Sequence, residues 1–272
     1  MCYLILITIY NTKIIDSPTL NSLKKCKDFI ADGKIVIWDN SFISQKEKDI
    51  NNLKLILKNT QIEYIHTPEN LPLSKIYNHL RTYNNKFDYI ILFDQDSHFD
   101  SQLFHSHKKA CQINKQYNLY LPLIIYKKNI ISPAFLFYFK GFYFKKKKIG
   151  PTNSLFKTAI NSGMIINFDY FTKDFKGYNE KLNFYGTDDN FMLQYQKYNK
   201  KFYILDYEIN HELTYSFMNN NPKQILERYK DANNALIINY EHNFIILFIL
   251  KIFLFIRGLF LSIKYKNMGF LK

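Results

Sequence analysis

The stretch FDYIILFDQDS, residues 87–97, is the part of the chain from which the fold can be worked out. Five apolar residues run from Tyr89 to Phe93 and end at two aspartates, Asp94 and Asp96, with one residue between them. A short continuous apolar run predicts a strand that is buried on both faces, as in a parallel sheet. Side chains alternate along a strand, so Asp94 and Asp96 are expected on one side and Gln95 on the other.

The two aspartates are expected where open α/β sheets bind ligands, at the carboxyl end of a central strand. Neighbouring carboxylates repel each other unless a cation or hydrogen-bond donors lie between them. A hard divalent cation that holds a phosphate accounts for the pair economically. A polar turn that simply ends a buried strand is the alternative.

Predicted strands and helices alternate three times before this stretch. The strands are expected at residues 3–10, 34–38, 61–65 and 87–93, and the helices begin near Ser17-Pro18 and span 45–58 and 70–83. This alternation is typical of right-handed βαβ units, so the predicted fold class is α/β with a mostly parallel sheet. Neither G-x-G-x-x-G after the first strand nor G-x-x-x-x-G-K-[ST] occurs, which removes the usual support for dinucleotide and P-loop sites.

The pattern after Ser97 is more mixed. We expect a helix at 101–117 and strands at 119–126, 161–168 and 201–207, the last followed by His211. FLFYFKGFYFKKKK, residues 135–148, predicts a loop or hairpin that contacts an acceptor or a membrane, or else a solvated basic turn beside core aromatics. YGTDDNF, residues 185–191, predicts a turn into a helix with Thr187 as its N-cap.

Length and composition fit a globular protein with an anionic partner. The 272 residues suffice for one large domain or two small ones, and 47% of them are hydrophobic. The net charge of +14 favours a nucleotide, a nucleic acid or an acidic membrane surface as partner. Cys2, Cys26 and Cys111 are widely spaced, which argues against a metal site or disulfide framework and favours a reducing compartment.

The last part of the chain changes character. NFIILFILKIFLFIRGLFLSI, residues 243–263, is long enough to span a bilayer but carries Lys251 and Arg257 near its middle, where charge is costly. A basic, amphipathic, very apolar helix that lies in the membrane interface is therefore favoured. Lys264, Lys266 and Lys272 would add attraction to anionic lipid. A spanning helix and a helix docked on protein remain the alternatives.

Three acidic motifs, taken in their order along the chain, resemble those of the GT-A glycosyltransferases, specifically inverting family 2. FDQDS is similar to the D-x-D motif, IVIWDNS (residues 35–41) to the second strand, and YGTDDNF to the acidic motif before the acceptor-side helix. The resemblance covers residues 3–215 and includes bacterial polysaccharide, lipooligosaccharide and rhamnosyltransferase-like members. Residues 70–78 fit the family pattern only loosely, and Asp188 stands where many members have Glu.

The resemblance implies a role for each acidic site. Asp94 and Asp96, joined by His211, would hold Mn²⁺ or Mg²⁺ against the donor diphosphate. Asp39 would accept a hydrogen bond from a uracil or thymine N–H, and Asp188, or else Asp189, would be the general base. The donor-binding residues that it implies are Thr8, Tyr10, Asn11, Asp39, Asn40, Asp94, Gln95, Ser162 and Gly163. Ordinary structural interpretations stay open: Asp-Asn-Ser favours turns, acidic residues complement a helix N-terminus, and Ser-Gly suits the entry to a strand.

The predicted protein is thus a metal-dependent inverting glycosyltransferase of bacterial surface glycan synthesis. Residues 1–215 would form the GT-A domain, with a Rossmann-like nucleotide-sugar half at 1–100 and a mixed acceptor half at 101–215. Residues 216–272 would attach it peripherally to the cytoplasmic face of the inner membrane. The donor would be UDP- or dTDP-linked, the acceptor an oligosaccharide or glycolipid, and nucleic acid no partner. A sugar-nucleotide nucleotidyltransferase is disfavoured because residues 11–17 hold no Gly or Arg, and a non-catalytic basic membrane- or nucleic-acid-binding protein is the other alternative.

Overall fold

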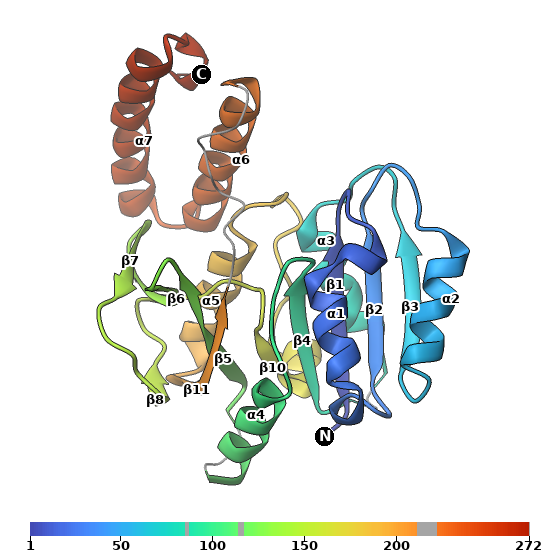
Figure 1. Ribbon diagram of the computed structural model, residues 1–272. Helices are drawn as coiled ribbons and strands as arrows, with labels where there is room; N and C mark the ends of the chain where they lie inside the picture. Colours follow the sequence, from blue (N-terminus) through green and yellow to red (C-terminus); the bar gives the residue numbers. More distant parts are fainter. Residues whose placement is uncertain (85–86, 114–116, 211–221, 272) are drawn as a thin grey trace.

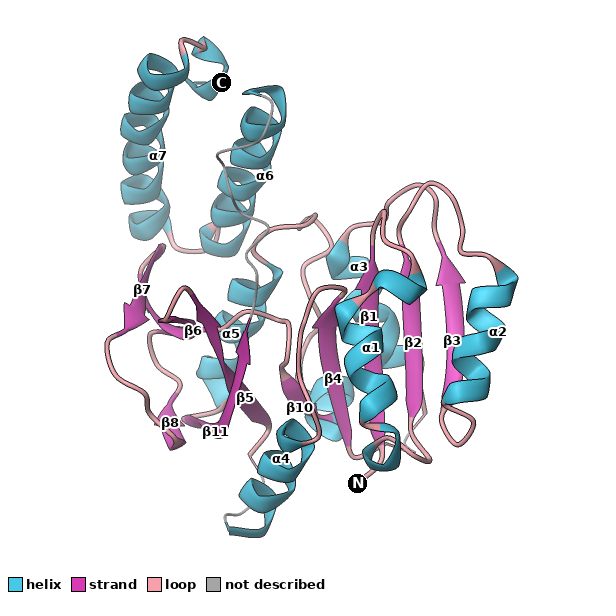
Figure 2. Ribbon diagram, in the orientation of Figure 1, coloured by secondary structure: helices cyan, strands magenta, loops and turns pink. Residues whose placement is uncertain are grey.

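The computed structural model describes residues 1–84, 87–113, 117–210 and 222–271. Its first half alternates strands and helices, as predicted (Figures 1 and 2). The elements are β1 (Tyr3–Ile9), α1 (Pro18–Lys25), β2 (Lys34–Asp39), α2 (Glu47–Ile56), β3 (Gln61–His66), α3 (Leu73–His79) and β4 (Tyr89–Asp94). All four strands are parallel, in the order β3-β2-β1-β4. Ser17 caps α1 by accepting a hydrogen bond from the Leu20 N–H, and Pro18 is the first helical residue.

The second half extends the same sheet with strands of both directions. Its elements are α4 (Gln102–Ile113), β5 (Leu119–Tyr126), β6 (Asn129–Phe137), β7 (Lys140–Phe144), β8 (Gly150–Asn153), β9 (Lys157–Thr158), β10 (Ile165–Asn167), α5 (Thr187–Tyr198) and β11 (Lys201–Asn210). The order continues β4-β10-β5-β11-β8, with β10 antiparallel to both neighbours and β5 parallel to β11. β6 and β7 form the predicted hairpin beside β5.

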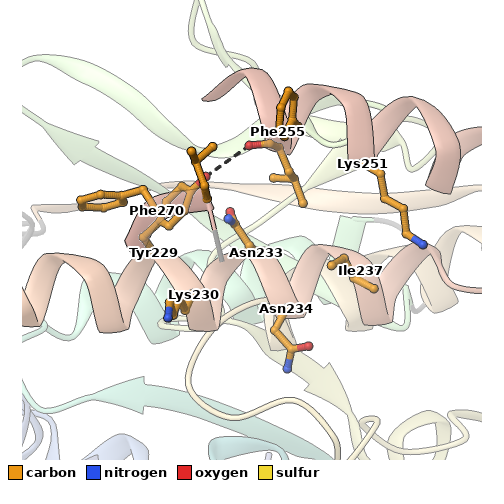
Figure 3. Close-up of a pocket in the computed structure, with 10 residues that line it drawn as sticks. Tyr229, Lys230, Asn233, Asn234, Ile237, Lys251, Phe255 and Phe270 are labelled. Atoms are coloured by element: carbon orange, nitrogen blue, oxygen red, sulfur yellow. Dashed lines mark hydrogen bonds between the residues drawn. The ribbon is translucent and has the colours of Figure 1, made fainter. Parts of the chain in front are cut away.

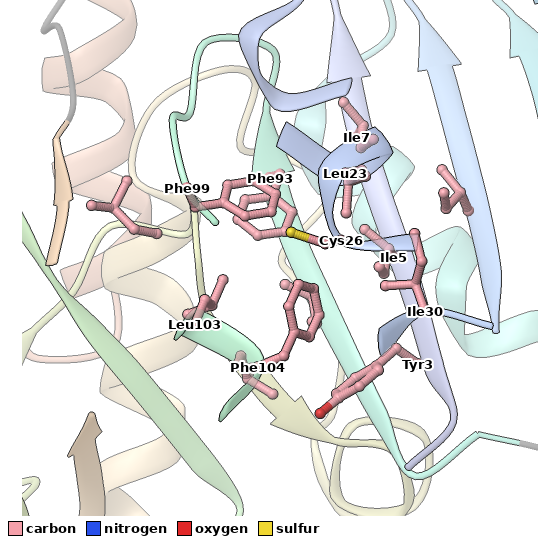
Figure 4. Close-up of a cluster of buried hydrophobic side chains, with 14 of the residues drawn as sticks. Tyr3, Ile5, Ile7, Leu23, Cys26, Ile30, Phe93, Phe99, Leu103 and Phe104 are labelled. Carbon is pink, nitrogen blue, oxygen red and sulfur yellow. The ribbon is translucent and has the colours of Figure 1, made fainter. Parts of the chain in front are cut away.

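The sheet is buried on both faces because alternate residues of its central strands enter two separate clusters. Ile5 and Ile7 of β1 point into one cluster, and Leu4 and Leu6 into the other. Figure 4 shows the first cluster, where Phe93 stacks on Phe99 at the end of β4 with ring centroids 4.4 Å apart. This packing on two sides explains the continuous apolar run and holds the turn after β4 rigidly in place.

Several predicted boundaries differ from the structure, and two of them lie beside predicted site residues. The N-cap of α5 is Gly186, with φ of 74°, and Thr187 is already helical, so the prediction of Thr187 as cap is wrong. A β-carbon at residue 186 would lie 2.8 Å from the Ala235 β-carbon, which explains why glycine occupies this position. The strand expected at 161–168 is shorter, because residues 161–164 form a turn before β10.

Two helices beyond the sheet end the described chain, α6 (Pro222–Tyr240) and α7 (Phe244–Tyr265), followed by the short turn η5 (Met268–Leu271). They stand side by side above the β6–β7 hairpin (Figure 1). The Tyr229 hydroxyl donates to the Leu254 carbonyl at 3.3 Å between them. Within the described residues, α7 is the one helix whose length and apolar character would allow a bilayer crossing, and most of it is exposed.

Candidate active site

The carboxyl ends of the parallel strands bring several predicted residues to one edge of the sheet. In the strand register Thr8 of β1 lies beside Asp94 of β4 and Trp38 of β2, and Ile9 lies beside Asp39. Parallel strands that start in register also end together, which explains why residues 8, 39 and 94 meet. The strand ends that carry Thr8, Asp39 and Asp94 therefore lie next to one another at this edge, and donor binding there stays a prediction.

The turn after β4 is fixed by hydrogen bonds to the loop after β1. The Gln95 side-chain oxygen accepts from the Tyr10 N–H at 2.7 Å, and the Gln95 carbonyl accepts from the Ser17 hydroxyl at 2.7 Å. Thr19 adds two contacts, since its hydroxyl donates to the Asp94 carbonyl and accepts from the Ser97 N–H. The Tyr10 backbone and the Gln95 side chain are thus in contact, and these bonds hold the turn that contains Asp94 and Asp96.

Ser162 and Gly163 lie against the same turn. The Ser162 hydroxyl accepts from the Asp94 N–H at 3.1 Å and lies 2.7 Å from the Ser97 hydroxyl. Gly163 has φ of 86°, and a β-carbon there would lie 2.9 Å from the Pro122 side chain and 3.0 Å from that of Ile209. Close packing therefore explains this glycine by itself, and a sugar contact at Ser162-Gly163 stays a prediction.

Asp39 is completely buried and has three hydrogen-bond donors. One carboxylate oxygen accepts from the Ser41 N–H at 2.9 Å, and the other accepts from the Gln45 amide at 3.0 Å and the Tyr64 hydroxyl at 2.6 Å. These bonds order the loop after β2. Sequence reasoning missed Gln45 and Tyr64, because no local pattern connects either of them to residue 39.

The two neighbours of Asp39 in the loop are fixed in a similar way. The Asn40 amide donates to the Leu71 carbonyl and accepts from the Thr67 hydroxyl. The Ser41 hydroxyl accepts from the Asn11 N–H at 2.8 Å, which joins this loop to the end of β1. The predicted donor residues Asn11, Asp39 and Asn40 thus belong to one hydrogen-bonded unit, and their contact with a base stays a prediction.

Asp188 and Asp189 lie in the first turn of α5, where they keep some exposure but are enclosed on most sides. Loss of solvation, followed by the charge of Asp189, raises the pKa of Asp188 to about 7, although backbone hydrogen bonds oppose the shift. Burial also raises the pKa of Asp189, against the hydrogen bond that it accepts from Thr158. A carboxylate with a pKa near neutral suits general-base catalysis.

The start of α5 is joined to the segment that lies against β4, because the Asn161 amide donates to the Thr187 hydroxyl at 3.0 Å. The charge of Asp94 contributes to the raised pKa of Asp188, which places the two carboxylates within electrostatic range. Tyr77 of α3 is buried close enough to sense both charges: burial raises the pKa of its hydroxyl well above normal, and the charges of Asp94 and Asp188 add to the effect. The structure therefore brings two of the acidic motifs into one region, and it adds Tyr77, which belongs to none of the sequence motifs.

The candidate metal ligands fit a hard divalent cation only in part. Asp94 and Asp96 supply carboxylates from one turn, and Mg²⁺ in particular is often held by one or two carboxylates with substrate phosphates completing its shell. Among the residues described here, no group of three or more His, Cys, Asp or Glu side chains is placed to hold a metal. His211, the predicted third ligand, lies outside the described residues.

No protein-family model and no curated protein matches the sequence. Solved structures match the fold. The crystal structure of S. aureus TarS 1-349 has a TM-score of 0.58 at 12% identity, over 88% of this chain and 65% of that one. GalNAc-T7 with UDP, GalNAc and Mn²⁺ has 0.50 at 13% identity, over 78% of this chain and 44% of that one.

A mannosyltransferase, PcManGT from Pyrobaculum calidifontis in complex with GDP-Man and Mn²⁺, has a TM-score of 0.52 at 8% identity, over 86% of this chain and 62% of that one. The chain thus spans less than two-thirds of each of these three structures. At such low identity the likeness concerns the fold. The α/β fold of GT-A type with a C-terminal apolar helix is therefore confirmed.

Proposed function

We propose that this protein is an inverting glycosyltransferase that moves a sugar from a nucleotide-diphosphate donor to an acceptor hydroxyl. The observation that carries the proposal is that the Asn161–Thr187 hydrogen bond ties the start of α5 to the segment beside Asp94, while the charge of Asp94 contributes to the raised pKa of Asp188. A donor phosphate near Asp94 and a base with a pKa near 7 would then flank one reacting carbon. The fold supports this, because the structural neighbours include proteins solved with UDP-GlcNAc and with GDP-Man.

Asp188 would act on the acceptor. Its carboxylate would take the proton from the acceptor hydroxyl as that oxygen attacks the anomeric carbon from the side opposite the leaving group. Asp189, whose side chain accepts a hydrogen bond from Thr158, is the less suitable base because that bond holds it in place. Single displacement with inversion follows from one base and no covalent intermediate.

Asp94 and Asp96 would hold the donor end of the reaction. Mn²⁺ or Mg²⁺ bound there would offset the charge that develops on the departing nucleoside diphosphate. The Gln95 and Ser162 contacts keep the turn in position, so that the donor meets a preorganised site. A uracil or thymine N–H would take the place of the Gln45 amide as a donor to Asp39, which favours a UDP- or dTDP-linked sugar.

The wider assignment belongs to the same proposal. Membership of family 2, a rhamnosyltransferase-like specificity and a role in bacterial surface polysaccharide or lipooligosaccharide synthesis rest on the motif order. An oligosaccharide or glycolipid acceptor at the cytoplasmic face of the inner membrane suits α7, whose exposed apolar side chains run along much of its length.

The test is donor turnover by the purified chain. We expect release of UDP or dTDP from a panel of nucleotide-sugars that requires Mn²⁺ or Mg²⁺ and falls at least about a hundredfold in Asp96→Asn and Asp188→Asn. Asp169→Asn is the matched control, because Asp169 is an exposed carboxylate paired with Lys173. Release of pyrophosphate from a nucleoside triphosphate and a sugar phosphate would instead identify a nucleotidyltransferase, and normal turnover by Asp188→Asn would disprove the base assignment.

A further inference from the structure

A groove between α6 and α7 is lined by cations and, among the residues that the structure describes, by no acidic side chain. It encloses a cavity of about 240 Å³, and its lining includes Arg228, Arg257 and Lys264 around the apolar side chains of Ile225, Leu261 and Phe270. None of the lining residues is Asp or Glu. Within the described part of the chain, the three cations make no ion pair with a carboxylate. This groove is called the cationic groove below.

Aromatic rings hold two of these cations. The Arg257 guanidinium lies 5.3 Å from the centroid of the Tyr229 ring, and the Lys264 ammonium lies 5.2 Å from that of the Tyr265 ring. Tyr229 is fixed in turn by its bond to the Leu254 carbonyl. A cation held on an aromatic face keeps its hydrogen-bond donors available, and guanidinium groups bind phosphate through paired hydrogen bonds. The chemistry of the groove therefore suits a phosphate or diphosphate.

The position of the groove connects α7 with the proposed base. Tyr185 also lines the cavity and precedes Asp188 by three residues, a length of chain that spans at most about 10 Å. Asp231 of α6 secures this segment by accepting hydrogen bonds from the Asn183 amide and the Phe184 N–H. A phosphate in the groove would thus lie between the exposed apolar face of α7 and the first turn of α5.

We infer that the cationic groove binds the phosphate or diphosphate of a lipid-linked acceptor, with its alkyl chain along α7 and its sugar directed toward Asp188. The inference rests on the proposed glycosyl transfer and adds the class of acceptor. A lipid whose sugar is attached through a phosphate matches three neighbouring features. These are the exposed apolar side chains of α7, the cations that have no carboxylate partner among the described residues, and the nearby Asp188. Binding of ordinary membrane phospholipid is the competing outcome.

A second cavity on the same helix pair supplies the control. It measures about 410 Å³ and is lined by Lys230 and Asn234 of α6 and Lys251 of α7, among others. Figure 3 shows that Lys230 and Asn234 project from the side of α6 away from α7, so its two lysines do not converge. Lys230→Gln with Lys251→Gln therefore removes the same charge from the same two helices as Arg228→Gln with Arg257→Gln.

The experiment measures binding of geranylgeranyl diphosphate in neutral detergent micelles to the full chain. We expect Arg228→Gln with Arg257→Gln to weaken binding at least about tenfold, and the lysine control to change it less than about threefold. Lys264→Gln, which leaves the Arg257–Tyr229 contact intact, should also weaken it, and circular dichroism would check the fold of each variant. Equal loss in both double variants would overturn the inference, because it would show general charge attraction only.

Two further arms separate the possible sources of failure. Vesicles that contain phosphatidylglycerol should bind both double variants equally, and a selective loss in the arginine variant there would assign the groove to phospholipid. Asp188→Asn should bind geranylgeranyl diphosphate normally. If the wild type binds geranylgeranyl diphosphate through the arginines but turns over no nucleotide-sugar, the proposed transfer is wrong and the proposed phosphate site is kept. If it turns over a nucleotide-sugar without such binding, the transfer is kept and the phosphate site is rejected.

Discussion

Asp188 is subject to two opposing demands. A general base must be ionised, yet enclosure by protein and the charges of Asp189 and Asp94 favour its neutral form. The resulting pKa of about 7 leaves the carboxylate partly protonated at neutral pH. A cation bound at Asp94 would lower this pKa, since opposite charge favours the ionised form. Under the proposed mechanism, donor binding and activation of the base would be coupled through the charge of Asp94.

We expect the rate of transfer to fall about tenfold per pH unit below the pKa of Asp188, because only the ionised carboxylate accepts a proton. Initial rates between pH 5.5 and 8.5 at saturating Mn²⁺ would measure this. The control is the same profile for Asp189→Asn, which should keep the dependence and move it to lower pH, since one raising charge is removed. A flat profile from pH 5.5 to 8.5 would contradict the assignment.

Asp188→Asn should make the protein more stable while it destroys activity. The folded pKa of about 7 lies above the unfolded value near 3.8, so the stability that comes from the neutral carboxyl is complete below pH 4 and is lost as pH rises through 7. Asparagine keeps this stability at every pH. We expect the free energy of unfolding to increase by about 1 kcal/mol or more at pH 8, with no difference at pH 4. Denaturation in the presence of a chelator measures it, and a loss of stability at pH 8 would show that the buried charge is well solvated.

At the scale of elements, sequence reasoning succeeded where the signal is local. The apolar run from Tyr89 to Phe93 predicted β4, and the register of parallel strands then places Asp94 beside Thr8 without further information. The spacing of Ser17-Pro18 predicted the start of α1 for the same reason. These patterns depend on residues that are close together in the sequence, so the structure that they favour does not depend on distant contacts.

Sequence reasoning failed where contacts join segments that are distant in the chain. Tyr77 has helical spacing typical of a core residue, and only the folded chain brings it near enough to Asp94 and Asp188 for their charges to add to the raised pKa of its hydroxyl. Likewise, Gly186 looks like an ordinary turn residue beside Thr187, until α6 packs on it through Ala235. No local sequence pattern predicts which distant residues meet at the site, or that α6 packs against α5.

Gly186→Ala should therefore loosen the junction of α5 and α6. Alanine at φ of 74° is strained, and its β-carbon would meet that of Ala235 at 2.8 Å. We expect the free energy of unfolding to fall by about 1–3 kcal/mol, with a loss of turnover because Asp188 follows two residues later. Gly141→Ala in β7 is the control, since its β-carbon would come no closer than 4.0 Å to the Phe135 carbonyl oxygen, and it should change stability by less than about 0.5 kcal/mol. Equal stability of both variants in urea denaturation would mean that α6 shifts freely.

At the scale of the whole molecule, apolar exposure and charge are unevenly distributed. α7 carries exposed apolar side chains along its length, and the adjoining β6–β7 hairpin contacts it through Phe139 and Phe253, whose ring centroids are 4.9 Å apart. The lysine run at residues 145–148 follows directly after this hairpin. Strands β1 to β4 lie to the right in Figure 1, away from α7 at the upper left. The molecule thus has one face suited to a membrane interface, with the candidate active site beside it.

The membrane proposal can be tested without removing any element. Ile256→Glu with Phe260→Glu places two charges one helical turn apart on α7, at side chains that are 60% and 67% exposed. Ile15→Glu with Leu55→Glu makes the same chemical change in the first half of the chain, at side chains that are 60% and 75% exposed. Each large apolar side chain withdrawn from the interface forfeits about 1.5–3 kcal/mol, so the α7 variant should lose at least about a hundredfold in partition to anionic vesicles.

Folding should be unaffected in both variants because all four side chains are exposed, and the control should remain bound to vesicles. Vesicle flotation at increasing salt adds a second measurement. Binding of the wild type, which has a net charge of +14, should weaken progressively as salt screens the charges. The wild type should keep a residual apolar affinity for the vesicles that the α7 variant lacks. If both variants partition like the wild type, the exposed face of α7 does not contact lipid, and another protein surface must cover it. A bilayer-spanning helix would instead show as wild-type protein that resists extraction by carbonate.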